Sequence, residues 1–187
     1  ASNPEFLREG SAINDFMRPD RVVVGVMGEK AKIVLEKLYS PLNLIETPIQ
    51  FTDLETAELI KYAANAFLAV KISYINQIAD LCEKVGADVH DVAKGMGMDK
   101  RIGAKFLHPG PGFGGSCFPK DTAALVKTAE QVGGKISIVE EVISYNQERK
   151  LSMAQRIISR LKTGIKNKKV SILGLAFKPE TDDVRDS

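Results

Sequence analysis

The sequence predicts a mixed α/β fold that is predominantly α, and three observations support this class. Residues 53–86 and 137–164 keep a helical spacing of apolar positions over unusually long segments. Residues 18–51 alternate strand, helix and strand, and residues 167–177 contain a β-branched run of the kind found in buried strands. We therefore expect a central domain with two long helices, residues 53–165, flanked by partial Rossmann-like α/β pieces in residues 1–52 and 166–187.

The composition is that of an ordinary soluble globular protein, with 44% apolar and 27% charged residues. The 26 basic and 24 acidic residues are spread along the chain, which argues against a nucleic-acid or membrane surface. No apolar run approaches the roughly 18 to 20 residues of a membrane span, and the N-terminus lacks the regions of a signal peptide. Cys82 and Cys117 are too few for a disulfide scaffold, so we expect a cytoplasmic protein.

The N-terminal residues predict a helix that starts at Asn3 and Pro4, a capping side chain followed by a residue suited to the first helical position. Such a helix would place Glu5 and Glu9 on one face. Paired carboxylates can organise a water or a proton, but on a surface helix we favour solvation.

The next segments predict a strand at 18–26, a helix from 29 that stops before Pro41, and a short strand at 47–51. This alternation is similar to the last part of a doubly wound domain. We therefore expect the chain to start within a fold whose beginning precedes residue 1.

The first long helix is predicted to begin at a capping box of Thr52 and Glu55 and to end at Gly86. Its apolar residues fall on two faces, so the helix should be buried on two sides. We expect one side to pack on its own domain and the other on a second copy of the protein, as a homodimer. The two faces are formed by Ile60, Ala64, Phe67, Ile75, Ile78 and Cys82, and by Leu59, Ala63, Ala66 and Val70.

Lys61 and Asn65 are polar exceptions, four residues apart in this apolar pattern. From spacing alone, a lysine that extends its amine to water and a capping-type asparagine explain them. A short helix should follow from Asp88 or His90. We interpret His90 as a solvated residue at the helix start and expect no metal site. Arg101 stands in a glycine-containing turn, where its guanidinium could reach a phosphate or a carboxylate.

Residues 106–123, FLHPGPGFGGSCFPKDTA, carry the strongest chemical signal. Four glycines give a backbone that can wrap a ligand, and Pro119 suits the start of a helix. Cys117 would then stand at a helix entrance, where the macrodipole and Lys120 favour the thiolate. Asp121 falls in the first turn, within reach of the same site. The alternative is that the cysteine is a small buried hydrophobe and the glycines form an ordinary loop. A second long helix should begin at a capping box of Ser137 and Glu140 and end at Gly164.

Four strings resemble the UDP-glucose/GDP-mannose dehydrogenase family over essentially the whole chain: NPEFLREGSAI, ELIKYAANAFLAVKISYINQIA, KRIGAKFLHPGPGFGGSCFPKD and GLAFKPETDDVRDS. The resemblance implies an NAD-dependent four-electron oxidation of a nucleotide sugar, through a cysteine thiohemiacetal and thioester. It makes residues 1–52 the end of an NAD-binding domain, 53–165 the dimerisation domain, and 166–187 the start of a UDP-binding domain. The strings FLREG and KFLHPGPG favour UDP-glucose, with UDP-glucuronate as product, over GDP-mannose or UDP-N-acetylmannosamine.

Carried over position by position, the resemblance implies a role for each matching residue. Cys117 would be the nucleophile, with Lys61, Asn65, Asp121 and Glu5 in the catalytic and water-positioning network. Arg101 would reach the partner subunit's substrate in a dimer. Lys61 and Asn65 would also bind substrate, together with Phe6, Leu7, Arg8, Glu9, Phe106, Leu107, His108, Pro109, Gly110, Gly114 and Lys178. The NAD contacts would be Glu9, Lys120 and Arg185.

One departure from the family is large, because no G-x-G-x-x-G fingerprint follows a strand. We therefore expect a fragment that retains the cysteine but does not hold NAD productively and is inactive alone. Two other classes stay open. One is a non-catalytic helical dimerisation module, and the other is a thiol enzyme that uses Cys117 without NAD.

Overall fold

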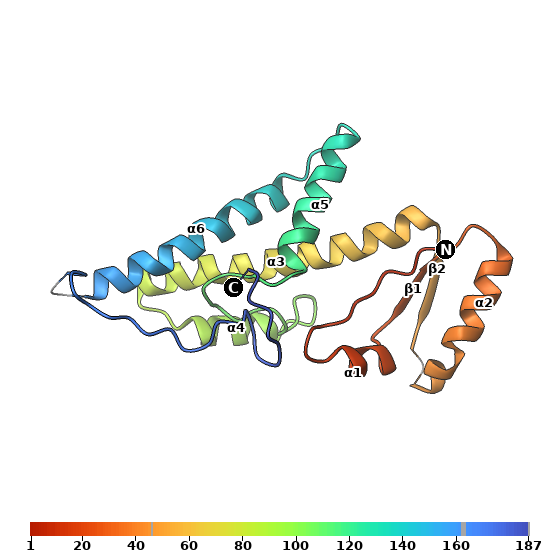
Figure 1. Ribbon diagram of the computed structural model, residues 1–187, viewed down its shortest axis with the longest axis horizontal. Helices are drawn as coiled ribbons and strands as arrows, with labels where there is room; N and C mark the ends of the chain where they lie inside the picture. Colours follow the sequence, from red (N-terminus) through yellow and green to blue (C-terminus); the bar gives the residue numbers. More distant parts are fainter. Residues whose placement is uncertain (46, 162–163, 187) are drawn as a thin grey trace. The chain divides into compact units, whose positions relative to one another are not determined.

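The computed structural model describes residues 1–45, 47–161 and 164–186. The chain forms two compact units, residues 1–64 with 178–182 and residues 65–177 with 183–187. Helices dominate the described residues, which contain one two-stranded sheet (Figure 1). The predicted mixed α/β, mainly helical class is therefore confirmed. Within the described ranges, no helix is both long enough and apolar enough to cross a membrane.

The first unit is built on a strand, a helix and a parallel strand, as predicted. Strand β1 (Val22–Gly25) pairs with β2 (Ile49–Thr52), with Val22 opposite Ile49. The connection contains α2 (Glu29–Tyr39) and the 3-10 turn η1 (Ser40–Ile45). A parallel pair needs such a crossover, and the β-branched side chains of β1 are buried.

The prediction of a helix that starts at Asn3 and Pro4 is wrong. Helix α1 spans Ala12–Met17, and the residues before it are extended. Ser2 exchanges two backbone hydrogen bonds with Gly25, of 2.8 and 2.7 Å. The Asn3 side chain donates to the Val23 carbonyl at 2.8 Å rather than capping a helix. Pairing with β1 thus outweighs the local helix-start signal.

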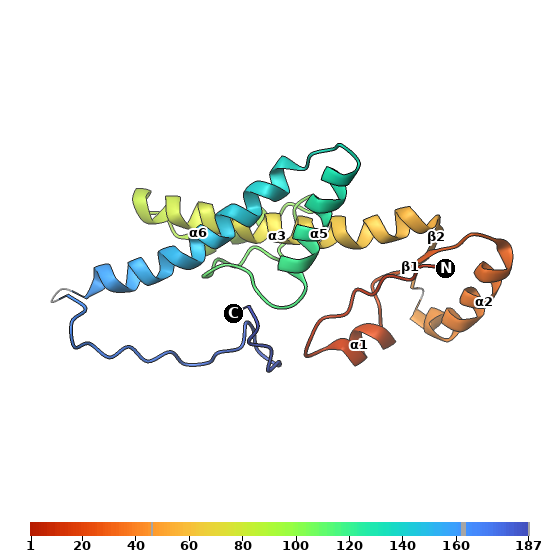
Figure 2. The same cartoon turned by 45° about the horizontal axis from the view of Figure 1, so that its top comes forward.

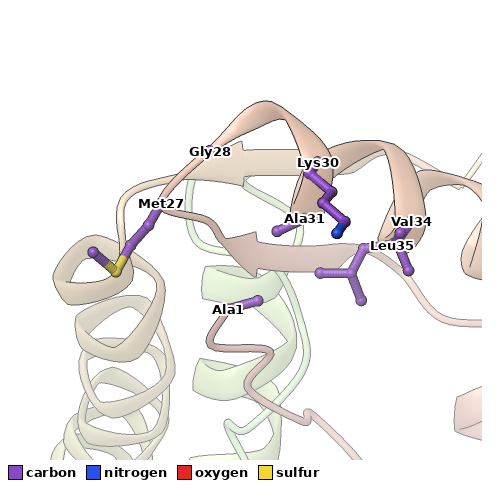
Figure 3. Close-up of a pocket in the computed structure, with 7 residues that line it drawn as sticks. All are labelled: Ala1, Met27, Gly28, Lys30, Ala31, Val34 and Leu35. Carbon is purple, nitrogen blue, oxygen red and sulfur yellow. The ribbon is translucent and has the colours of Figure 1, made fainter.

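A shallow hollow of about 560 Å³ lies beside α2 (Figure 3). Its lining is mainly apolar, and the side chains of Met27 and Val34 are exposed. None of the residues predicted for the active site belongs to this lining, which consists of Ala1, Met27, Gly28, Lys30, Ala31, Val34 and Leu35.

Helix α3 (Leu54–Val85) contributes residues to both units. The predicted capping box at its start is wrong. Asp53 caps the helix, accepting hydrogen bonds from the Thr56 amide at 2.7 Å and the Thr56 hydroxyl at 2.8 Å. The helix ends as predicted before Gly86, whose φ of +75° is the left-handed conformation typical of a residue that follows a helix.

The second unit packs the later part of α3 with α4 (Val89–Gly97), α5 (Phe118–Gln131) and α6 (Ser137–Arg160). In both views α6 runs across α3 (Figures 1 and 2). Ala69, Phe113 and Val142 form a buried apolar cluster that joins α3, the loop before α5, and α6. Asp88 caps α4 by accepting from the His90 amide at 2.7 Å, so one of the two predicted starts is confirmed.

Two further predictions fail in this unit. Helix α6 begins without the predicted capping box, since Glu140 pairs with Lys135 at 3.4 Å instead. The strand predicted in residues 167–177 is not formed, because described residues 164–186 carry neither helix nor strand and Leu173 is 96% exposed. A buried strand needs a neighbour for its N–H and C=O groups, and the described sheet contains only β1 and β2.

Candidate active site

Cys117 occupies the N-cap of α5, which confirms its predicted place at a helix entrance. The helix begins at Phe118, so Pro119 is its second residue rather than its first. The thiol is partly buried, with the Ser116 hydroxyl 3.7 Å from Sγ. The unpaired N–H groups of a first helical turn favour negative charge at this position. The Cys117 side chain therefore lies beside the unpaired N–H donors of the first turn of α5.

Asp121 lies one turn further along α5 and is the buried charge of the site. Its side chain is 2% exposed, and Oδ2 accepts a 2.6 Å hydrogen bond from Asn65 Nδ2 on α3. Lys120 Nζ is 3.1 Å from Oδ1, with its own side chain 69% exposed. The structure thus brings together three predicted residues, and Asn65 holds the carboxylate rather than capping a helix.

The glycine-rich loop is held by polar side chains that sequence reasoning missed. Asn76 Oδ1 accepts from the Gly110 amide at 2.8 Å, and Arg149 Nε donates to the Gly110 carbonyl at 3.0 Å. Asn146 Oδ1 accepts from the Phe113 amide at 2.8 Å, and its Nδ2 donates to the Phe113 carbonyl at 2.9 Å. Both ends of the segment 110–113 are therefore fixed by α3 and α6.

A signal for these side chains was present in the sequence. Asn76 follows Ile75 inside the buried stripe of α3, and Asn146 and Arg149 are three apart on α6, which places them on one face. Buried polar residues need partners, and the glycine-rich loop has backbone groups to offer. Asp80 pairs with Arg149 at 2.5 Å and so holds the guanidinium in place.

Two glycines of the loop allow close packing. Gly112 has a φ of +133°, and a Cβ there would lie 2.7 Å from Asn146 Oδ1. A Cβ on Gly114 would lie 1.9 Å from the Asp186 carbonyl oxygen, which also accepts from the Gly115 amide at 2.8 Å. Larger residues at 112 or 114 would displace the loop, so these glycines serve contacts within the protein.

Glu5 and Lys61, both predicted as catalytic, meet in the first unit. Lys61 Nζ donates to the Glu5 carbonyl at 2.6 Å and lies 3.3 Å from Glu5 Oε1. The same ammonium is 5.5 Å from the centre of the Phe6 ring, and the Arg21 guanidinium is 4.1 Å from that ring. Glu5 Oε2 also accepts from the Leu7 amide at 2.6 Å. Glu5 is thus held by backbone and side chain without a helix.

Arg8 and Glu9, the next predicted residues, have partners of their own in this unit. Arg8 Nη2 is 2.5 Å from Asp15 Oδ1, and its hydrogen bonds hold the pKa of Asp15 well below the usual range. Glu9 Oε2 accepts from the Thr181 hydroxyl at 3.1 Å. Lys178, also in the first unit, is half-buried.

The remaining predicted residues lie in the second unit. The Arg101 side chain is 89% exposed and pairs with Asp99 at 2.6 Å, which lowers the pKa of that carboxyl group. Arg185 Nε donates to Asp183 at 2.9 Å. Phe106 has a φ of +65°, and its ring centre is 6.1 Å from that of Phe118. Of the other loop residues predicted to bind substrate, Leu107 is buried, Pro109, Gly110 and Gly114 are half-buried, and His108 is exposed.

Two family models match the chain. Residues 55–148 match the UDP-glucose/GDP-mannose dehydrogenase family, central domain, and residues 1–43 match the NAD binding domain of the same family. Together they cover the long helix, the cysteine loop and the strand–helix segment of the first unit.

Individual relatives agree with these matches. The chain is 58% identical over 188 residues to the UDP-glucose 6-dehydrogenase of Rhizobium meliloti (strain 1021), which covers 100% of this chain and 43% of that protein. The solved structure of a UDP-glucose dehydrogenase from the archaeon Pyrobaculum islandicum aligns with a TM-score of 0.92 at 44% identity, over 100% of this chain and 42% of that one. The chain therefore spans less than half the length of these relatives.

Proposed function

Because the chain belongs to the UDP-glucose/GDP-mannose dehydrogenase family, we propose that Cys117 serves the NAD-dependent oxidation of UDP-glucose to UDP-glucuronate. The observation that carries the proposal is Cys117 at the N-cap of α5, one turn from a buried Asp121 held by Asn65. UDP-glucose is favoured over GDP-mannose, since the two UDP-glucose dehydrogenases named above are 58% and 44% identical to the chain, whereas a solved GDP-mannose dehydrogenase from Pseudomonas aeruginosa is 34% identical.

Each residue has a defined task in this proposal. Two NAD molecules, bound in turn, would supply the hydride acceptors, one for the hydride of the sugar's primary alcohol and one for the hydride of the thiohemiacetal. The Cys117 thiolate adds to the aldehyde carbon, and the resulting thiohemiacetal is oxidised to a thioester. Water then cleaves the carbon–sulfur bond, which releases the carboxylate and restores the thiol. Lys61 and Asn65 stabilise the oxyanion at the sugar carbon, and Glu5 and Asp121 position the water.

The cofactor contacts are proposed for Lys120, Glu9 and Arg185. Lys120 fits a phosphate contact, because its exposed ammonium lies at the start of α5. The glycines at 110, 112 and 115 have the G-x-G-x-x-G spacing, but in the described part of the chain no strand leads into them. We therefore propose that the 187-residue chain alone does not catalyse the oxidation of UDP-glucose.

The substrate contacts and the domain division remain part of the same proposal. Residues 1–52 belong to the NAD-binding domain, 53–165 to the central domain and 166–187 to the UDP-binding domain. Both cysteines are free thiols, which suits the reducing cytoplasm. The proposed substrate contacts are Phe6, Leu7, Arg8, Glu9, Lys61, Asn65, Arg101, Phe106, Leu107, His108, Pro109, Gly110, Gly114 and Lys178.

A second copy of the protein is the proposed partner of α3. Phe67, Tyr74 and Leu81 are exposed and recur every seven residues, so they lie on one face of the helix. Burial of such a stripe stabilises a homodimer through the hydrophobic effect. Light scattering should give a dimeric mass that Phe67→Asp reduces to the monomer, and an unchanged mass would contradict this interface.

The activity test uses the complete gene product. Formation of NADH from NAD and UDP-glucose should be lost in Cys117→Ser and kept in Cys82→Ser. GDP-mannose and UDP-N-acetylmannosamine serve as competing substrates in the same assay. The 187-residue chain should give no NADH, and turnover near that of the complete product would contradict its proposed inactivity.

The other function classes give different results. A dimerisation module would be unaffected by Cys117→Ala. In a thiol enzyme that works without NAD, Cys117 would be alkylated rapidly and the activity would not depend on NAD. Equal, slow alkylation of Cys117 and Cys82 at neutral pH would argue against an activated thiol.

A further inference from the structure

The segment 110–113 is fixed at both ends. At each end residue, Gly110 and Phe113, the backbone N–H and the backbone carbonyl are both hydrogen-bonded. At Gly110 the N–H and the carbonyl are bound by Asn76 and Arg149, and at Phe113 both are bound by the single amide of Asn146. Two bonds from one planar amide set the position and also the orientation of the Phe113 backbone. Asn146 is 3% exposed, so water does not compete for these bonds.

The apolar surroundings of Asn146 show that its polarity has a cost. Asn146 binds the backbone of Phe113, which belongs to the buried apolar cluster with Ala69 and Val142. Val142 lies on α6, one turn before Asn146. Burying an amide requires desolvation, and removing one partner of a buried hydrogen bond leaves the other partner unsatisfied. The amide at this position therefore serves the Phe113 backbone, whose N–H and carbonyl would lose their partner without it.

Phe113 connects this amide to the cysteine. Its ring meets the Phe118 ring edge-on at 6.1 Å, and Phe118 is the first residue of α5, directly after Cys117. A displaced Phe113 would therefore move the residue that follows the thiol. Reactive groups must be held to about 0.5 Å by their supporting contacts, and a shift of about 1 Å can lower a rate on the order of a hundredfold.

We propose that Asn146 is a positioning residue for Cys117: it fixes the Phe113 backbone and, through Phe118, the entrance of α5. Arg149 and Asn76 secure the other end of the segment. The effect on turnover rests on the proposed dehydrogenase function, whereas the effect on the loop and the thiol does not.

The test compares Asn146→Ala with Gln147→Ala in the complete gene product. Gln147 is the matched control, an exposed amide at the next position of α6. In Asn146→Ala, hydrogen exchange at the Phe113 amide should accelerate at least on the order of tenfold, and the rate of Cys117 alkylation by iodoacetamide should change severalfold. The kcat for NADH formation should fall on the order of ten- to a hundredfold with a smaller change in KM. Gln147→Ala should match the wild type in every measurement.

A second variant keeps the test decisive if Asn146→Ala folds poorly. Gly112→Ala removes no buried polar group but drives a Cβ against Asn146 Oδ1 and strains a φ of +133°. It should reproduce the faster exchange, the altered alkylation and the lower kcat.

The proposal is overturned if folded variants melt at lower temperature yet keep the wild-type alkylation rate and kcat, since that is the behaviour of a purely structural asparagine. A wild-type product that makes no NADH refutes the dehydrogenase function instead. In that case hydrogen exchange and alkylation alone decide the positioning role.

Discussion

Replacing Asn65 with alanine should destabilise the helical unit through the carboxylate of Asp121. The amide of Asn65 donates to Asp121 Oδ2 at 2.6 Å, and that side chain is 2% exposed. Alanine removes this donor from Asp121 Oδ2. Because the Asp121 side chain is buried, bulk water does not replace the lost hydrogen bond. Lys120 remains 3.1 Å from the other oxygen, but its exposed ammonium compensates weakly.

The size of the effect follows from this geometry. A hydrogen bond to a charged group contributes about 1.5–3 kcal/mol, and a buried acceptor that loses its partner costs a similar amount. We therefore expect the free energy of unfolding of Asn65→Ala to fall by about 2–3 kcal/mol. The double-mutant cycle with Asp121→Ala should give a coupling energy of about 1.5 kcal/mol or more.

Urea unfolding followed by circular dichroism measures both quantities. Gln77→Ala is the control, because it removes an exposed amide from the same helix and should change stability by less than about 0.5 kcal/mol. A loss below about 0.5 kcal/mol in Asn65→Ala, or a coupling energy near zero, would refute the reasoning. Either result would mean that the buried carboxylate does not depend on Asn65.

Three further predictions concern the two ends of α3 and the loss of folding stability at low pH. Gly86→Ala should cost about 1–2 kcal/mol, because alanine resists a φ of +75°, while Gly86→Asn costs less; thermal melts compare the two. Asp53→Ala should lower the melting temperature and Asp53→Asn should not, because asparagine can still accept from the Thr56 amide; equal losses would rule out capping. The hydrogen bonds from Arg8 lower the folded-state pKa of Asp15 below its unfolded value, so this stabilisation is complete above about pH 4 and is lost as the pH falls further. Urea midpoints from pH 7 to 2 should therefore fall less steeply in Arg8→Met than in the wild type, and parallel curves would contradict the linkage.

The elements that depend on local pattern were predictable from the sequence. Helices α2, α3 and α5 and the parallel pair β1–β2 follow from apolar periodicity, β-branched runs and punctuation by Gly and Pro. The location of Cys117 at a helix start was predictable for the same reason, because Pro119 marks the start of α5.

The errors arise where distant residues decide between local options. The Asn3 side chain can cap a helix or bind a strand, and in the structure it donates to the backbone of β1, 20 residues away. Thr52 and Asp53 are both capping residues, and side-chain geometry at the end of β2 selects Asp53. The run in 167–177 has the residues of a strand, but a strand exists only beside a neighbour.

The supports of the cysteine loop were missed because they are long-range contacts between polar side chains and backbone. Asn76 and Gly110 are 34 residues apart, and Asn146 and Phe113 are 33 apart. Periodicity marks these asparagines as polar residues among apolar ones, but it does not name their partners.

The hydrogen bonds that hold the loop are made to the backbone N–H and carbonyl groups of Gly110 and Phe113, which every residue except proline would provide at those positions. The neighbouring His108 and Pro111 have exposed side chains that none of these four hydrogen bonds uses. Substitutions at these two positions change the surface that the loop presents and leave the four hydrogen bonds in place. The supports of the loop and its exposed side chains can therefore be mutated independently of each other.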